Sequence, residues 1–258
     1  MFLTKRQKIF ISSILLALSI VAISVIGEEN KLPLLALVVL GSYFISLWSI
    51  YDRFSVFELV SLFVLPVTLT LSFGLFLSQF EVSSGTIFLL VIVYIVAMYT
   101  ILLSENIFNV SVERNIPLVR AARTVGYLTT LFVSFAFFTL VFGLGMNNFA
   151  FAAVSAIAGV LIFVQGYWQI ELKETDTKKL VSFSLTAGLI IGEVALALSF
   201  WPLTPPKLGI ALTATVYVLL GLIQHYVKEN LNKRTVLEYL FVAAGVVLLL
   251  VLTTSWGV

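Results

Sequence analysis

The sequence predicts an all-α, polytopic integral membrane protein with about nine transmembrane helices. Its 258 residues are 60% hydrophobic and only 11% charged, a far more apolar composition than that of an ordinary soluble domain. Charge-free runs such as 32–51 and 82–103 are long enough to cross the hydrocarbon core of a bilayer, which takes about 20 helical residues. Loops are short throughout, so we expect a single membrane domain over residues 1–258, located in the cell membrane.

The distribution of Lys and Arg predicts the orientation of these helices. Charged residues, Pro, Gly and Asn bound spans at about 9–26, 32–51, 56–77, 86–103, 122–142, 149–170, 181–201, 207–227 and 236–255. A cytoplasmic N-terminus then places 13 of the 15 basic residues inside, where positive charge is favoured, and leaves only Lys31 and Lys207 outside. Adding or removing one helix would spoil this alternation. We therefore expect the N-terminus inside and the C-terminus outside.

The first span has a second interpretation. It begins with basic residues, continues with an apolar stretch, and contains the small-residue sequence Ala22-Ile23-Ser24, which is typical of a signal-peptide cleavage site. Cleavage there would leave a very short segment ahead of the next helix. A retained first helix is therefore the favoured interpretation.

Repeated side-chain patterns suggest that the eight later helices form four tandem hairpins. The sequence Val164-Gln165-Gly166-Tyr167 ends the sixth span, and Ile223-Gln224-His225-Tyr226 ends the eighth, 59 residues later (226 minus 167). A duplicated hairpin would explain this offset and would give parallel repeats. The alternative is that aromatic and polar residues gather at any membrane interface.

Glu193 is the candidate ion or proton site. It lies near the middle of the seventh span, where an ionised carboxylate costs at least a few kcal/mol. We therefore expect it to face the protein interior and to stay protonated or to find a partner. Hydroxyl groups expected at similar depth belong to Tyr217, Tyr94 and Thr68. The alternative is a neutral Glu that only joins helices by a hydrogen bond.

Two polar groups are expected on the cytoplasmic side. The first is a belt one turn into several helices, either closing the bundle floor or lining a vestibule, and it comprises Glu58, Arg123, Gln165, His225 and Glu238. The second is a set of three arginines, Arg114, Arg120 and Arg123, in an interfacial segment over 104–123. These arginines could bind anionic headgroups or a lipid phosphate, although membrane orientation alone also calls for basic residues there.

Several classes of chemistry are disfavoured by residue content. The chain has no Cys and one His, so thiolate chemistry, bis-histidine haem and an HExxH zinc site lack their residues. No glycine-rich nucleotide motif, catalytic residue, metal site or cofactor site is predicted, and nucleic-acid binding has no support. An enzyme is therefore less expected than a non-enzyme.

Three functions remain from different classes. The first is a carrier or channel for a small solute or ion that uses Glu193. The second is a non-catalytic subunit or scaffold that contacts the bilayer and protein partners in the membrane. The third is a lipid-phosphate enzyme or flippase that uses the arginines. The mid-span acid favours transport, by a small margin.

Overall fold

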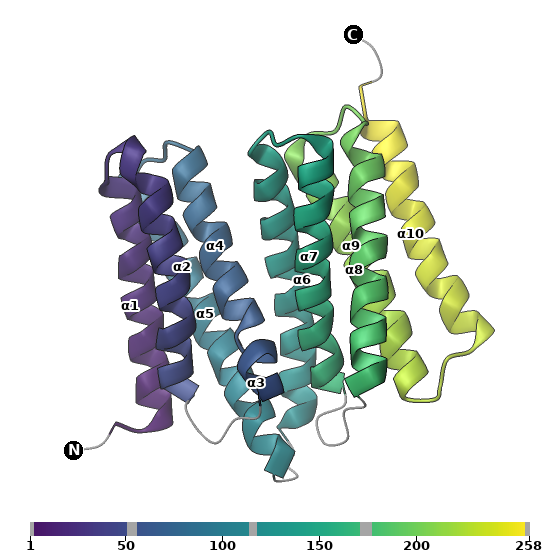
Figure 1. Ribbon diagram of the computed structural model, residues 1–258, viewed down its shortest axis with the longest axis horizontal. Coiled ribbons are helices and arrows are strands. Elements are labelled where there is room, and N and C mark those ends of the chain that lie inside the picture. The colour runs from purple at the N-terminus through teal and green to yellow at the C-terminus, as the bar shows by residue number, and fades with distance from the viewer. Residues whose placement is uncertain (1–2, 51–55, 114–117, 171–176, 256–258) are drawn as a thin grey trace. The chain divides into compact units, whose positions relative to one another are not determined.

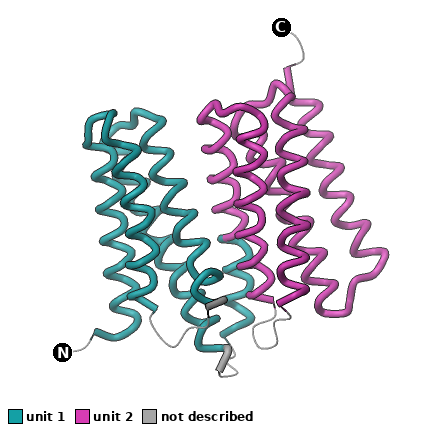
Figure 2. Tube along the Cα trace, viewed as in Figure 1, with its two compact units in different colours: residues 1–129 teal, residues 130–258 magenta. Residues whose placement is uncertain are grey.

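The computed structural model describes residues 3–50, 56–113, 118–170 and 177–255. Within these ranges all regular structure is helical, and nine helical segments are long and apolar enough to cross a membrane. The predicted all-α polytopic fold is therefore confirmed, whereas the side of the membrane on which each end lies stays a prediction. The chain divides into two compact units, residues 1–129 and residues 130–258 (Figure 2).

Unit 1 is a helical bundle in which α1 packs against α2, α4 and α5, and α2 also packs against α4 (Figure 1). A short helix, α3, precedes α4. A last helix, α6, begins in this unit and continues past residue 130 into unit 2. The bounds are α1 Lys5–Val25, α2 Glu28–Ile50, α3 Val56–Ser61, α4 Val64–Gln79, α5 Ser84–Glu113 and α6 Val119–Gly143.

The first helix is part of the core of unit 1. It begins at a capping box, in which the Gln7 N–H donates to Thr4 Oγ1 (3.4 Å) and the Thr4 N–H donates to Gln7 Oε1 (2.9 Å). Its buried side chains recur at helical spacing and contact the neighbouring helices, as Ile9, Leu16 and Ile23 do. This packing favours a retained span over a cleaved signal peptide.

Pro66 explains why the third span is broken into α3 and α4. Proline has no N–H to donate to the carbonyl of Leu62, and its ring clashes with that carbonyl in a continuous helix. The chain therefore turns at Leu62 and Phe63, and the Phe63 N–H bonds to Val60 instead of to Leu59 (3.3 Å). The Leu59 carbonyl, left without its helical donor, accepts a hydrogen bond from the Tyr43 hydroxyl at 3.3 Å.

The fourth predicted span is too short. The sequence placed its end near residue 103, but α5 continues to Glu113, so most of the expected interfacial segment after 103 is helical. The reason is that the buried face of α5 keeps its helical period beyond residue 103, and its buried residues are Tyr94, Met98, Ile101, Glu105, Phe108 and Asn109. No Pro or Gly lies between Gly85, at the start of α5, and Pro117.

Unit 2 contains the rest of α6 and four further helices. Helix α7 packs against α8 and α9, α8 also packs against α9, and α10 packs against α9 (Figure 1). The first residues of α9 are Pro205 and Pro206, which suit a helix start because the first N–H groups have no helical acceptor. The bounds are α7 Asn148–Ile170, α8 Thr177–Ser199, α9 Pro205–Val227 and α10 Lys233–Thr253.

Helices α7 and α8 approach each other at backbone distance. A Cβ atom added to Gly188 would lie 2.7 Å from the Ala156 carbonyl oxygen and 2.9 Å from the Val160 nitrogen. A Cβ atom on Gly192, one turn later, would lie 2.8 Å from the Cβ atom of Ala156. Real Cβ atoms do not come this close to other atoms, so both positions require glycine. The sequence carries Gly188 and Gly192 one turn apart, a small-residue pair that predicts close packing between membrane helices, and the structure confirms this packing.

Candidate functional site

Helix α8 has two different faces. The face toward α7 and α9 carries small and aliphatic residues, and its buried positions are Leu180, Ser184, Ala187, Gly188, Ile191, Gly192 and Ala195. The opposite face carries Leu185, Leu189 and Glu193 at spacings of four residues, and all three side chains are exposed in unit 2. We call this second stripe the outer face of α8.

The structure places Glu193 differently from the sequence expectation. Its carboxyl is exposed on the outer face, so the expected burial inside the bundle is wrong for unit 2, and no described residue hydrogen-bonds it. Gly188 and Gly192 occupy the packed side, because a helix approaches its neighbour most closely through its smallest residues. Glu193 also lies five residues beyond Gly188, the centre of α8, which is about 8 Å along the axis.

The expected hydroxyl neighbours of Glu193 divide between the two units. Tyr94 and Thr68 belong to unit 1, where Tyr94 is fully buried and its hydroxyl lies 2.9 Å from Thr70 Oγ1. Thr70 Oγ1 donates its hydrogen to the Pro66 carbonyl (2.8 Å), so Tyr94 is the donor in the shared bond. Thr68 Oγ1 donates to the Val64 carbonyl at 2.7 Å.

Tyr217 belongs to unit 2, as Glu193 does, but it packs on α10. Its ring lies 5.3 Å from the ring of Tyr239, and the Tyr239 ring covers Gly221. A Cβ atom at position 221 would displace the end of the Tyr239 ring from α9. The grouping of Glu193 with Tyr94, Thr68 and Tyr217 stays a prediction.

The belt residues of unit 2 have three different environments. Gln165 is fully buried in α7. His225 Nδ1 lies 2.8 Å from Asn230 Oδ1 and thereby braces the turn that follows α9. Glu238 is exposed on α10 and accepts a hydrogen bond from Arg234 Nε at 3.2 Å. The three side chains thus have different surroundings, and the belt stays a prediction.

The remaining belt residues and the arginines lie in unit 1 or outside the described residues. Glu58 is buried in α3, and Arg123 is half-buried in the first turns of α6. Arg120 is exposed three residues before Arg123, so the two share a side of that helix. Arg114 lies outside the described residues. Binding of a lipid phosphate by these arginines stays a prediction.

The sequence interpretation missed a buried polar group on α5. The Glu105 side chain is 1% exposed, and Asn109, one turn later, is also buried. The sequence predicts an interfacial segment for both, because the apolar run ends at residue 103. The helical period that runs from Tyr94 through Met98 to Glu105 was the signal that could have placed them. In the part of the chain that the structure describes, no group of three or more His, Asp or Glu residues could hold a metal.

The sequence matches the model of one protein family. A family model described as protein of unknown function (DUF5656) matches residues 33–253, which is most of the chain. The chain belongs to the DUF5656 family. Comparison with curated proteins and with solved structures gave no match. The region matched in this DUF5656 protein includes α8 with Glu193, and it begins after α1.

Proposed function

We propose that this DUF5656 protein is a non-catalytic subunit of a complex in the cell membrane. It would assemble through the outer face of α8. The observation that supports this proposal is the exposed carboxyl of Glu193 between apolar residues on a membrane-spanning helix. Leu189, one turn earlier, is 61% exposed, and Leu185 is 56% exposed. Such a stripe suits contact with lipid or with another helix, except for its one acid.

The energetic argument concerns the acid. Glu193 lies six residues before the end of α8 at Ser199, or about 9 Å along the helix axis, and therefore still within the apolar part of the span. A carboxyl group facing hydrocarbon costs a few kcal/mol and is rare for that reason. A second protein surface that supplies a hydrogen-bond partner removes most of this cost. The outer face is thus better suited to a protein contact than to lipid.

The proposed occupant is a second copy of this chain. A protonated carboxyl group is self-complementary, since it has one O–H donor and one carbonyl acceptor. A two-fold axis passing near Glu193 would pair the two carboxyls reciprocally, with Leu185 and Leu189 packing beside them. No Lys or Arg lies near Glu193 along α8, so a neutral pair is favoured over an ion pair.

The test measures self-association in liposomes. Because the chain has no Cys, one dye can be attached at Ser84→Cys, an exposed position in unit 1, and dimerisation can be followed by energy transfer between labelled copies. We expect dimers for the natural sequence and for Glu193→Gln, whose amide keeps one donor and one acceptor. Glu193→Leu should weaken association about 10-fold or more, because interhelical hydrogen bonds in membranes contribute about 1 kcal/mol each.

The control changes an exposed residue elsewhere in unit 2. Leu248→Ala on α10 alters an apolar side chain that is also exposed, and it should leave association unchanged. A chain that stays monomeric at every protein-to-lipid ratio contradicts the proposal. So does a Glu193→Leu variant that associates as tightly as the natural sequence.

Ion-coupled transport through Glu193 is the second candidate, and the observation behind it is an acid within the apolar part of a membrane-spanning helix. A carboxyl enclosed between Gly188, Gly192 and a neighbouring helix could not exchange its proton at a transport rate, and Glu193 is not so enclosed. Proton or cation flux into liposomes containing the protein tests this candidate. Glu193→Gln should abolish the flux while preserving the dimer. Absence of flux with the natural sequence, or equal flux with the variant, contradicts the transport function.

A further inference from the structure

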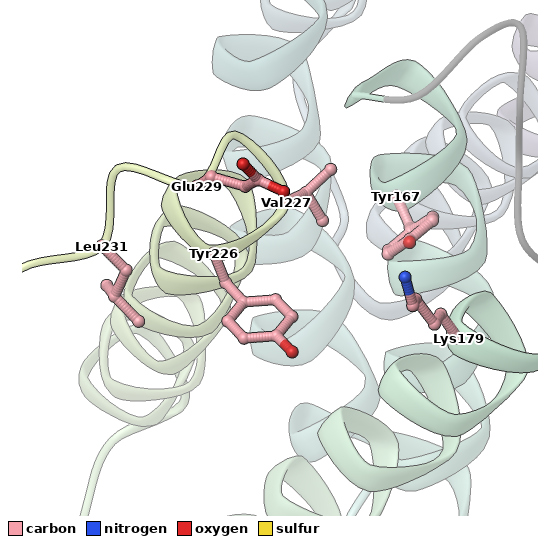
Figure 3. Close-up of a pocket in the computed structure, with 6 residues that line it drawn as sticks. All are labelled: Tyr167, Lys179, Tyr226, Val227, Glu229 and Leu231. Carbon is pink, nitrogen blue, oxygen red and sulfur yellow. The ribbon is translucent and has the colours of Figure 1, made fainter.

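A cavity opens at one end of unit 2, where α7 ends, α8 begins and α9 turns toward α10 (Figure 3). Its volume is about 560 Å³, within the range of about 300–1,000 Å³ that small-molecule sites occupy. The lining combines two tyrosines, one cation, one carboxylate and two aliphatic residues: Tyr167, Lys179, Tyr226, Val227, Glu229 and Leu231. All six belong to unit 2.

Aromatic packing fixes one wall of the cavity. The ring of Phe183 on α8 stacks on Tyr167 at 5.9 Å and meets Tyr226 edge-on at 5.5 Å. Tyr167 is buried, and its position is therefore set by the bundle, whereas Tyr226 is exposed on the open side. These are the two tyrosines that end the repeated VQGY and IQHY sequences, so the repeat brings both to one site.

Glu229 reaches the cavity from a turn with an unusual backbone. After α9, the Asn230 N–H bonds to the His225 carbonyl and the Glu229 N–H bonds to the Tyr226 carbonyl, each at 3.0 Å. This is a Schellman motif, in which the residue at the position of Glu229 is usually glycine because its φ is positive. Glu229 has φ 54°, and among the described residues no other non-glycine residue has a positive φ.

Strained backbone positions cluster at functional sites, which makes the Glu229 side chain a candidate for a binding role. The carboxylate of Glu229 stands on the Tyr226 side of the cavity, and the ammonium of Lys179 stands beside Tyr167 (Figure 3). Opposite charges therefore approach the same space from different helices. A ligand that carries a phosphate and an ammonium group would meet both charges, and the exposed ring of Tyr226 would be available to its cation.

We propose that this cavity binds the phosphate–ammonium headgroup of a zwitterionic phospholipid. Lys179 would bind the phosphate, and Glu229 with the face of Tyr226 would bind the ammonium. Val227 and Leu231 also line the cavity and would add apolar contact for the first part of the acyl chains. The cavity lies at the ends of spanning helices, where tyrosines gather and headgroups are found. The site is independent of the assembly proposed through Glu193.

The experiment measures binding to the purified full-length protein in detergent by native mass spectrometry. The ligands are dihexanoyl phosphatidylethanolamine, dihexanoyl phosphatidylglycerol and soluble phosphoethanolamine. We expect phosphatidylethanolamine to bind at least about tenfold more tightly than either of the others, since each lost charged hydrogen bond costs about that factor. Equal binding of phosphatidylglycerol overturns the zwitterion assignment. Equal binding of soluble phosphoethanolamine overturns the lipid assignment.

Variants separate the two charges. Lys179→Gln should weaken binding of both lipids about tenfold, whereas Glu229→Gln should weaken only phosphatidylethanolamine and remove the preference. Matched controls are Lys233→Gln and Glu238→Gln, two exposed charges of α10 that do not line the cavity. Losses of the same size in the controls contradict the site.

Glu229→Gly distinguishes recognition from backbone strain. Glycine adopts the positive φ without a Cβ atom, so this variant should have a higher Tm than the natural sequence. It should nevertheless lose the preference for phosphatidylethanolamine, as Glu229→Gln does. A higher Tm with unchanged lipid preference assigns Glu229 a purely structural position and overturns its role in binding.

Discussion

The two faces of α8 differ in side-chain size more than in polarity. The packed face carries Ser184, Gly188 and Gly192, and it brings α8 within backbone distance of α7. The outer face carries Leu185, Leu189 and Glu193, all exposed in unit 2. Two leucines and the acid thus lie outside, while a polar serine and two glycines lie inside, next to the buried Leu180 and Ile191. A soluble protein would show the opposite arrangement.

The physical reason is the solvent. Lipid tails are as apolar as leucine, so burying a leucine between membrane helices gains little, and close packing of small residues becomes the main attraction. Hydropathy therefore identifies a span but not its packed face. The outer Glu193 is the exception that calls for a partner, because lipid does not compensate a carboxyl group.

The largest expected effect comes from enlarging the packed face. Gly188→Leu places a side chain against the Ala156 carbonyl oxygen and the Val160 nitrogen, so α7 and α8 must separate. We expect a loss of about 3 kcal/mol in the free energy of unfolding. Gly245→Leu on α10 is the control, since a Cβ atom there meets nothing within 4 Å, and it should change stability by less than about 1 kcal/mol. Unfolding in SDS mixed micelles, followed by circular dichroism, measures both.

A second variant sharpens the comparison by removing polarity from the packed face. The Ser184 hydroxyl is fully buried and has no hydrogen-bond partner, as is also true of Ser155 on α7. Ser184→Ala should therefore stabilise unit 2 by about 1 kcal/mol. Ser13→Ala is the control, because Ser13 Oγ donates to the Ile9 carbonyl at 2.9 Å and no gain is expected. A clear loss of stability in Ser184→Ala would show that its hydroxyl has a partner.

Unit 1 offers the opposite case, a buried hydroxyl with a partner. Tyr94→Phe removes the hydrogen bond to Thr70 Oγ1 without changing the shape of the ring, which also packs 5.2 Å from Phe73. The expected cost is about 1 kcal/mol in the same unfolding assay. An unchanged free energy of unfolding would mean that this bond contributes nothing beyond ring packing.

The smallest effect is expected on the outer face. Leu189→Ala shortens a side chain that is already exposed and leaves no cavity, so the unfolding free energy of the detergent-solubilised monomer should change by less than about 0.5 kcal/mol. The free energies of unfolding of Leu189→Ala and of Gly188→Leu, at adjacent positions, can be compared directly because the same assay measures both. A loss of 2 kcal/mol or more at Leu189 would place it on a packed face and reverse the comparison.

Sequence patterns predicted the features of this fold that depend on neighbouring residues alone. Uncharged runs located the spans. The Gly188–Gly192 pair predicted close packing, because two glycines one turn apart let a neighbouring backbone approach, whichever helix that neighbour is. The effect of Pro66 on its own helix is likewise local. The orientation of Glu193 could not be predicted in the same way, since it depends on which side of α8 packs against other helices.

The length of α5 shows a different limit. Charged and amide residues such as Glu105 and Asn109 end an apolar run in the sequence, but they do not end a helix, whose backbone bonds are indifferent to them. Their burial depends on the surrounding helices of unit 1. The sequence likewise does not predict the cavity beside Glu229. The position of the Glu229 side chain in its lining depends on a positive φ at a residue that is not glycine.

Disulfide cross-linking in native membranes tests the assembly through α8 most directly. The chain has no Cys, so Leu185→Cys, Leu189→Cys and Ala197→Cys can each be introduced alone, with Glu193 kept, and Leu248→Cys on α10 serves as the control. Two cysteines form a disulfide only when their Cα atoms come within about 7 Å. Oxidation should give a covalent dimer at one or more of the three α8 positions and none at 248. Dimers at 248 alone, or at no position, would contradict assembly of two copies through the outer face of α8.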